Sequence, residues 1–181
     1  VYMEHKELWA TTGEIDESLV VPLGKAATLR AGSDLTIVSW SKMAQVALEA
    51  AGDLAGQGVS ADVIDLRTLW PWDRDAVLDS AARTGRLLVV HEAIQAAGFG
   101  AEVAATAAEQ LGCRVARLGA PRGHPGALSG PVCRARLGGG DVRELANGER
   151  LHQLTLVLDR LDEDFVVLAR HGRTPYRGIR L

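Results

Sequence analysis

The chain of 181 residues is poor in the residues that build familiar catalytic and metal sites. Its two cysteines, Cys113 and Cys133, are too few for a disulfide framework or a clustered thiolate site, and we interpret them as core or incidental thiols. No histidine pair has the His-x-x-x-His spacing of a metal site, and no Gly-x-Ser-x-Gly or Gly-x-x-x-x-Gly-Lys motif occurs. The sequence therefore predicts no catalytic, cofactor-binding or metal residues in this chain.

Two further absences limit the class of partner. No run of about 18 uncharged apolar residues exists, so we expect no membrane span and a cytoplasmic protein. The net charge is −3 and the pI is near 6.0, which argues against a nucleic-acid partner because such proteins usually carry a basic patch.

The charge is distributed unevenly along the chain. Residues 1–121 carry ten basic and 16 acidic side chains, whereas residues 122–181 carry ten and seven. All three lysines precede Pro121, and every basic residue after it is arginine. We therefore predict a boundary near Arg122.

Before that boundary, short apolar runs alternate with segments of helical periodicity. Strands are predicted at 35–40, 61–66, 87–90 and 113–118. Helices are predicted at 43–54, between Pro71 and Gly85, and at 101–111. This alternation indicates an α/β fold of three layers, with a mostly parallel sheet covered by helices on both faces.

The segment from Arg86 to Glu102 contains the residues that merit most attention. Gly98 and Gly100 precede a predicted helix, but the third glycine of a dinucleotide-binding fingerprint is missing. Several residues also separate these glycines from the end of the preceding predicted strand, whereas the fingerprint needs a tight strand-to-helix turn. Close approach of a neighbouring segment is the favoured interpretation, with dinucleotide binding as the alternative.

His91 and Glu92 follow the third predicted strand. A histidine at a sheet's carboxyl edge can shuttle protons, and a carboxylate can tune it. Consecutive side chains of an extended segment point to opposite faces, however, so a His91–Glu92 dyad is disfavoured. Backbone or subunit contacts are the preferred roles for both.

Several motifs occur in an order that resembles a known family. They are EHKELW at 4–9, VPLGKA at 21–26, LTIV at 35–38, VIDLRTL at 63–69, VHEA at 90–93 and GFGAE at 98–102. Residues 1–121 resemble the transketolase C-terminal domain. They look most like the C-terminal part of the beta subunit of the thiamine-diphosphate-dependent decarboxylating component of pyruvate or branched-chain 2-oxo acid dehydrogenase complexes.

The resemblance implies an oxidoreductase subunit that works in a heterotetramer. Its partners would be a second beta subunit, an alpha subunit and the dihydrolipoyl acyltransferase core. Thiamine diphosphate with magnesium would bind outside this chain, which we expect to be inactive and cofactor-free in isolation. The resemblance also makes His91, Glu92, Gly98, Phe99 and Gly100 candidate subunit-interface residues.

The same resemblance divides the chain into three parts. Residues 1–33 would be the last strand of a preceding domain and a connector, residues 34–121 the α/β domain, and residues 122–181 an irregular divergent tail. Family members usually continue with V-T-P-V-P-Y where this chain reads GHPGAL at 123–128. A one-nucleotide shift of suitable codons for GHPGAL yields that turn, so we hypothesise that the tail is translated out of frame.

One pattern in the tail favours an ordered element. Leucine and phenylalanine recur three and four residues apart between 151 and 168, which is typical of an amphipathic helix at 150–169. A chance stripe in a leucine-rich shifted frame explains the spacing equally well.

Three functions remain open from the sequence. The first is a C-terminal fragment of a 2-oxo acid dehydrogenase beta subunit that serves assembly and docking, with an acetoin dehydrogenase beta subunit as its rival. The second is a non-catalytic interaction module or the product of a decayed gene. The third is the dinucleotide-binding domain that the glycine spacing disfavours.

Overall fold

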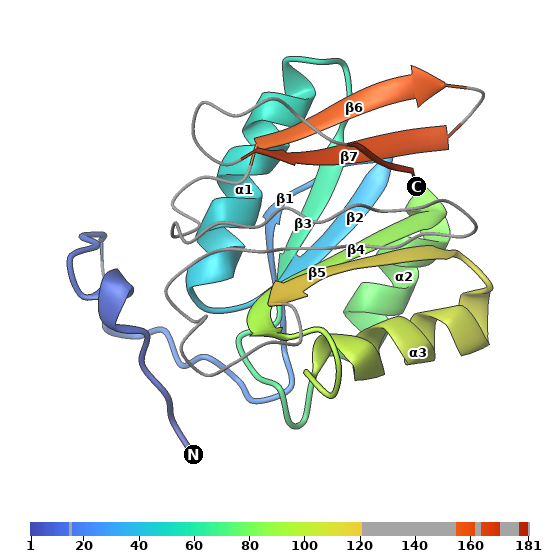
Figure 1. Cartoon of the computed structure of the whole chain (residues 1–181). Helices are drawn as coiled ribbons and strands as arrows, with labels where there is room; N and C mark the ends of the chain where they lie inside the picture. The colour runs from blue at the N-terminus through green and yellow to red at the C-terminus, as the bar shows by residue number, and fades with distance from the viewer. Residues whose placement is uncertain (15, 121–154, 162–163, 171–177, 181) are drawn as a thin grey trace.

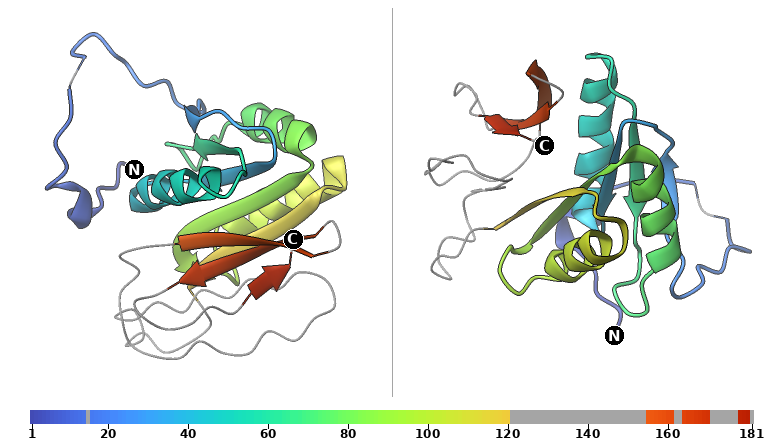
Figure 2. Two further views of the ribbon diagram at one scale, coloured as in Figure 1. Left: turned by 90° about the horizontal axis from the view of Figure 1, so that it is seen from above. Right: turned by 90° about the vertical axis from the view of Figure 1, so that its right-hand side faces the viewer.

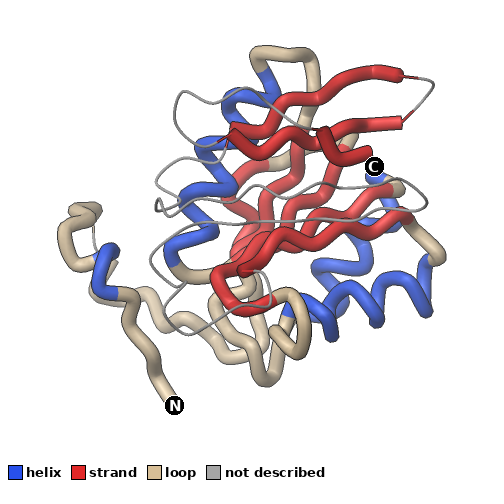
Figure 3. The backbone as a smooth tube through the Cα atoms, in the orientation of Figure 1, coloured by secondary structure: helices blue, strands red, loops and turns tan. Residues whose placement is uncertain are grey.

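The computed structural model describes residues 1–14, 16–120, 155–161, 164–170 and 178–180. Its centre is a five-stranded sheet in the order β1-β3-β2-β4-β5 (Figures 1 and 3). Strands β2 (Leu35–Ser39), β3 (Ala61–Asp65), β4 (Arg86–Ile94) and β5 (Arg114–Ala120) are parallel. The predicted mostly parallel sheet is therefore confirmed.

Three helices connect these strands. Helix α1 spans Lys42–Ala55, α2 spans Arg74–Thr84 and α3 spans Gly100–Leu111, as the periodicity predicted. Glycine ends two of them: Gly85 and Gly112 adopt the left-handed conformation after α2 and α3, with φ of 70° and 60°.

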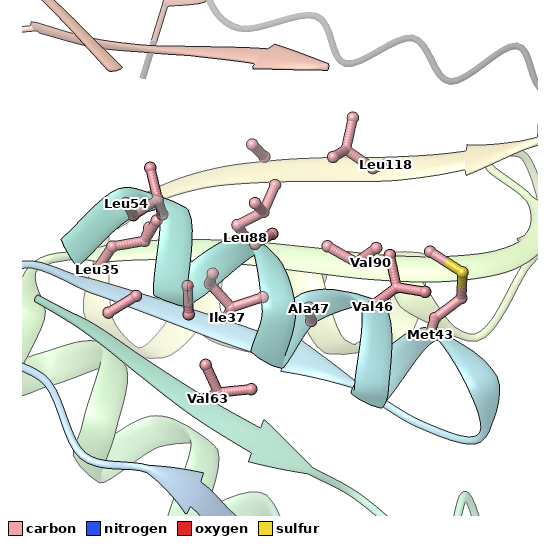
Figure 4. Close-up of a cluster of buried hydrophobic side chains, with 14 of the residues drawn as sticks. Leu35, Ile37, Met43, Val46, Ala47, Leu54, Val63, Leu88, Val90 and Leu118 are labelled. Carbon is pink, nitrogen blue, oxygen red and sulfur yellow. The ribbon is translucent and has the colours of Figure 1, made fainter. Parts of the chain in front are cut away.

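The sheet separates two apolar cores. Helix α1 packs on one face, where Val46, Ala47 and Leu54 meet Ile37 and Val63 (Figure 4). Helices α2 and α3 cover the other face, where Val77 and Val103 pack with Val38 and Val89. Figure 2 shows α1 and the α2–α3 pair on opposite sides of the sheet. This arrangement is the predicted three-layer α/β architecture, and every residue of β2 is buried because both faces are covered.

The region at 1–33 contributes more to the sheet than the sequence indicated. Residues Ala27–Arg30 form β1, which pairs antiparallel with β3 at the edge of the sheet. Near the N-terminus, where the resemblance suggested a strand, the structure has a single 3₁₀ turn at Lys6–Leu8. A histidine cap explains this turn, since the His5 ring accepts a hydrogen bond from the Glu7 amide.

The tail differs from its prediction. Strands β6 (Thr155–Leu161), β7 (Asp164–Arg170) and β8 (Gly178–Arg180) form an antiparallel sheet on the α1 side, so the helix predicted at 150–169 is wrong. The sequences TLVL and FVVL are rich in the β-branched and aromatic residues that favour strands. Leucine at 156 and 158 also fits the two-residue period of a strand, which the helical interpretation overlooked. Residues 121–154, which include the GHPGAL segment, lie outside the described part of the chain.

Candidate functional site

The order in which the strands are added to the sheet changes direction between β2 and β4, which makes this point a topological switch point. From β2 it passes through α1 to β3 on one side, and then through α2 to β4 on the other. The carboxyl ends of two such adjacent strands form a crevice where ligands bind in open α/β folds. The Ser39 hydroxyl links the ends of β2 and β4, because it donates a 2.8 Å hydrogen bond to the Val90 carbonyl. This edge is the candidate site because topology alone selects it.

Aromatic side chains fill this switch point. The Trp40 indole, directly after β2, stacks on the His91 imidazole with ring centroids 5.3 Å apart and planes 11° apart. Phe99 meets the edges of both Trp40 and Trp72, with centroids 5.8 Å and 6.1 Å apart. Such edge-to-face pairs add to the apolar burial of the rings. The crevice is therefore packed with side chains of this chain.

Three glycines fit closely around the His91 ring. A Cβ at Gly98 would lie 2.8 Å from His91 Cε1, and one at Gly119 would lie 3.0 Å from the same atom. A Cβ at Gly100 would overlap His91 Nε2. The prediction that Gly98 and Gly100 allow close approach of a neighbouring segment is confirmed. The imidazole thus lies against Gly100, the first residue of the helix whose N-terminus would have to face a pyrophosphate, which further disfavours dinucleotide binding.

The surroundings of His91 disfavour the charged form of its imidazole. Its side chain is 2% exposed, and this burial is the main cause that lowers its pKa. The positive charge of Arg117 on β5 lowers that pKa further. The guanidinium is held in place because Arg117 Nη1 donates to the Gln95 carbonyl at 2.7 Å, while Gln95 Nε2 donates to the Arg117 carbonyl at 2.8 Å.

Glu92 lies on the opposite side of the strand from His91. Its carboxylate is exposed and pairs with His5, whose Nε2 is 3.2 Å from Oε1 and 3.1 Å from Oε2. The side chains of His91 and Glu92 thus form no dyad, as the alternation along a strand predicted. The pair instead ties the first residues of the chain to the end of β4.

The five predicted interface residues divide by burial. Glu92 is exposed, Gly98 and Phe99 are half-buried, and His91 and Gly100 are buried within this chain. The two buried residues would act on an interface only by shaping the turn between β4 and α3. At the end of β4, Ile94 is an exposed apolar side chain, at 44%.

The backbone is unusual after each of the three central strands. Ser41 after β2, Arg67 after β3 and Ala97 after β4 have φ of 57°, 55° and 64°. Each such residue costs about 1–3 kcal/mol, and such residues cluster at functional edges. At the second of them, the Arg67 amide donates to Asp65 Oδ1 at 3.1 Å. Burial nevertheless raises the pKa of the Asp65 carboxyl.

The residues at this edge do not fit thiamine diphosphate or its magnesium. Within the described ranges, no three histidine, cysteine or acidic side chains lie close enough to hold a metal ion. At the switch point itself, the rings of Trp40, His91 and Phe99 pack against one another. That the isolated chain binds no cofactor stays a prediction, and we derive no catalytic step for it. The part of the chain that the structure describes also has no helix with the length and hydropathy to cross a membrane.

Cys113 carries no function that the structure reveals. It is a free, half-buried thiol before β5, and burial raises its pKa, which disfavours the reactive thiolate. This agrees with the structural role predicted from the sequence. Cys133 lies outside the described residues.

Sequence reasoning missed the aromatic packing and the N-terminal contact. The signal for the packing was present, since three of the four tryptophans end or follow predicted strands, at positions 40, 70 and 72. The His5–Glu92 pair spans 87 residues and left no local signal.

The topology and the aromatic packing at the switch point define a doubly wound α/β domain. Comparison with known families gives its place among such domains. Residues 24–138 match the model of the transketolase C-terminal domain, and the chain belongs to this family. The match extends past residue 121, the end of the region that the motifs cover.

Individual relatives share about two fifths of the aligned residues. The chain is 42% identical over 111 residues to the acetoin:2,6-dichlorophenolindophenol oxidoreductase subunit beta of Cupriavidus necator, covering 61% of this chain and 33% of the relative. It is 40% identical over 117 residues to the mitochondrial 2-oxoisovalerate dehydrogenase subunit beta 2 of Arabidopsis thaliana, covering 64% and 33%. It is 43% identical over 112 residues to the pyruvate dehydrogenase E1 component subunit beta of Staphylococcus epidermidis, covering 61% and 34%.

A solved structure of a transketolase relative has a similar fold. The chain superposes on a split-gene transketolase, described as an inactive beta4 tetramer, with a TM-score of 0.56 and 32% identity. The superposition covers 59% of this chain and 36% of that one. The chain thus spans about a third of the length of the curated relatives that it matches.

Proposed function

We propose that this chain is the C-terminal assembly domain of a beta subunit in the decarboxylating component of a 2-oxo acid dehydrogenase complex. The observation that carries the proposal is the packed switch point: a domain of the beta-subunit family presents its carboxyl edge filled with Trp40, His91 and Phe99. Such an edge can contact another subunit.

The partners that we propose are a second beta subunit, an alpha subunit and the dihydrolipoyl acyltransferase core. The similarity to subunits of pyruvate and 2-oxoisovalerate dehydrogenases supports a multi-subunit setting. The split-gene transketolase supports self-association of beta chains without activity. Thiamine diphosphate with magnesium would be bound by the rest of the complex, in the cytoplasm.

An acetoin dehydrogenase beta subunit is a second candidate, supported by the Cupriavidus necator relative. A non-catalytic module or a decayed gene product is the third candidate. The sequence of the surrounding gene would test this third candidate and the frame of the tail.

Sedimentation equilibrium tests the assembly role. Ile94, the exposed apolar side chain at the end of β4, is the residue to change, and we expect Ile94→Lys to weaken self-association at least tenfold, since a charge buried in a contact is costly. Leu48→Lys on α1 is the matched control, because Leu48 is similarly exposed at 36% but lies away from the carboxyl edge. A wild-type chain that stays monomeric at high concentration would contradict the proposal.

A second assay separates assembly from chemistry. The chain alone, given thiamine diphosphate, magnesium and a 2-oxo acid, should release no carbon dioxide. Release of carbon dioxide by the chain alone would show that the reacting groups lie in this domain and would overturn the proposed division of labour.

A further inference from the structure

The His91 imidazole is a buried polar ring without a hydrogen-bond partner. Neither Nδ1 nor Nε2 has a partner in the structure, although the side chain is 98% buried from solvent. Most buried polar groups in proteins are hydrogen-bonded, and leaving one unpaired costs stability. A leucine of similar volume would avoid that cost, so packing alone does not account for a histidine here.

The surroundings of the ring accept only its neutral form. Trp40 covers one face, and Gly98, Gly100 and Gly119 approach its edge so closely that none has room for a Cβ. An added proton would thus sit against glycine backbone with no acceptor in reach. Gly100 is also the first residue of α3, whose helix dipole places partial positive charge near the ring.

The charged groups on the neighbouring elements either disfavour a positive charge on the His91 imidazole or do too little to stabilise one. On β5, the Arg117 guanidinium acts on the imidazole and disfavours a second positive charge. On the turn after β4, Glu92 is exposed and already paired with His5. On α3, the nearest carboxylate in sequence is that of Glu102, which is exposed in the first turn.

We propose that His91 makes the carboxyl edge sensitive to acid: proton uptake by its imidazole releases residues 92–99, the edge turn, from the sheet. Solvent supplies the proton, and one of the two free ring nitrogens accepts it. The imidazolium then needs a hydrogen-bond acceptor, which water provides only once the edge turn has moved away. This property belongs to the fold of the single chain and does not depend on the proposed assembly role.

The sign of the pH dependence follows from linkage. The pKa of His91 in the folded chain lies below its usual value of about 6.5, so the opened state binds the proton more tightly than the closed state. The closed turn is therefore fully stable above about pH 6.5 and loses stability as the pH falls below it. One proton raises the opening constant by up to about tenfold per pH unit.

Hydrogen exchange at several pH values tests the proposal on the full chain. Corrected for the intrinsic exchange rate, the amides of the edge turn should exchange up to about fivefold faster at pH 5.5 than at pH 6.5, while those of β3 and α2 stay unchanged. His91→Leu should remove this acceleration, because leucine fills the space without titrating. His5→Gln is the matched control, since His5 also contacts the end of β4, and it should leave the acceleration intact.

A second variant with a different readout tests the proposal even if the His91→Leu chain does not fold. Arg117→Gln removes the repelling charge, so the His91 ring, followed by NMR through its contacts with Trp40, should titrate at higher pH than in the wild type. The proposal is overturned if the wild-type ring titrates at or above pH 6.5. It is equally overturned if the edge turn shows no acid response, if His5→Gln abolishes that response, or if all segments open together.

Discussion

The His91 imidazole and the Trp40 indole are stacked across the switch point, with centroids 5.3 Å apart, although they are 51 positions apart in sequence. One follows β2 and the other belongs to β4, the two parallel strands between which the chain changes direction. Where other open sheets of this topology bind a ligand, this chain has packed two of its own rings. The pair therefore joins the centre of the fold to the edge that we propose for assembly.

Truncating the indole should destabilise the chain markedly. Trp40→Ala removes the contacts with both His91 and Phe99, and we expect a loss of about 2–4 kcal/mol, somewhat below the cost for a fully buried aromatic residue. Urea denaturation followed by circular dichroism measures it. Trp70→Ala is the matched control, because Trp70 is 83% exposed and should change stability by less than about 0.5 kcal/mol. Equal effects of the two variants would show that the stack is unimportant.

Adding one methyl group at Gly100 should also be destabilising. Alanine normally favours a helix over glycine, but here its Cβ would overlap His91 Nε2 in a ring that Trp40 holds in place. We expect Gly100→Ala to cost about 1–3 kcal/mol. Gly52→Ala in α1 has open space around the new Cβ and should stabilise by about 0.5–1 kcal/mol. Thermal denaturation of both variants checks the opposite signs, and a stabilising Gly100→Ala would refute the close packing.

Helices and strands with a regular local pattern of apolar residues could be predicted from the sequence. Elements that depend on partners distant in the sequence could not. Helix α1 and strand β2 follow from apolar spacing and uninterrupted apolar runs. Strand β1 escaped prediction because its pattern of burial is irregular and only β3 pairs with it. The 150–169 segment was misassigned because leucine spacing satisfied two periods at once.

The candidate site shows the same division. The glycines around residues 98–100 indicated a close approach, and the identity of the approaching group, His91, emerged only from the fold. The strand rule correctly separated His91 from Glu92. Their actual partners, Trp40 and His5, lie at long range and could not be found by spacing.

A buried hydroxyl network at the other end of the sheet should be costly to interrupt. Ser80 donates to Asp62 Oδ2 at 2.6 Å and shares a 2.7 Å hydrogen bond with Thr36, whose hydroxyl also bonds that of Thr84 at 2.7 Å. Ser80→Ala leaves the buried carboxylate of Asp62 without this donor, and we expect a loss of about 1–3 kcal/mol.

Ser18→Ala is the control for that measurement. Ser18 bonds Asp16 at the surface, so its removal should change stability by less than about 0.5 kcal/mol. Both variants are compared by urea denaturation. A Ser80→Ala chain as stable as the wild type would mean that the Arg83 guanidinium, which also donates to Asp62, is a sufficient partner for the carboxylate.

Asp73 joins the connector to the first turn of α2. Its Oδ1 caps the helix by accepting from the Ala76 amide at 3.4 Å, and its Oδ2 accepts from the Ala26 amide at 3.0 Å, with Lys25 Nζ 3.7 Å away. Asp73→Ala should cost about 1–2 kcal/mol through the lost cap and should also speed hydrogen exchange at Ala26.

Asp73→Asn separates the two roles, because its amide oxygen can still cap the helix while its NH₂ group cannot accept from Ala26. We expect it to retain most of the stability but to exchange faster at Ala26. Asp75→Ala, in the same helical turn, is the control and should lose only about 0.3–1 kcal/mol of helix-dipole stabilisation without affecting Ala26. Unchanged protection of Ala26 in both Asp73 variants would show that other contacts, such as the 3.0 Å hydrogen bond from the Gly24 amide to the Thr68 hydroxyl, hold the connector in place.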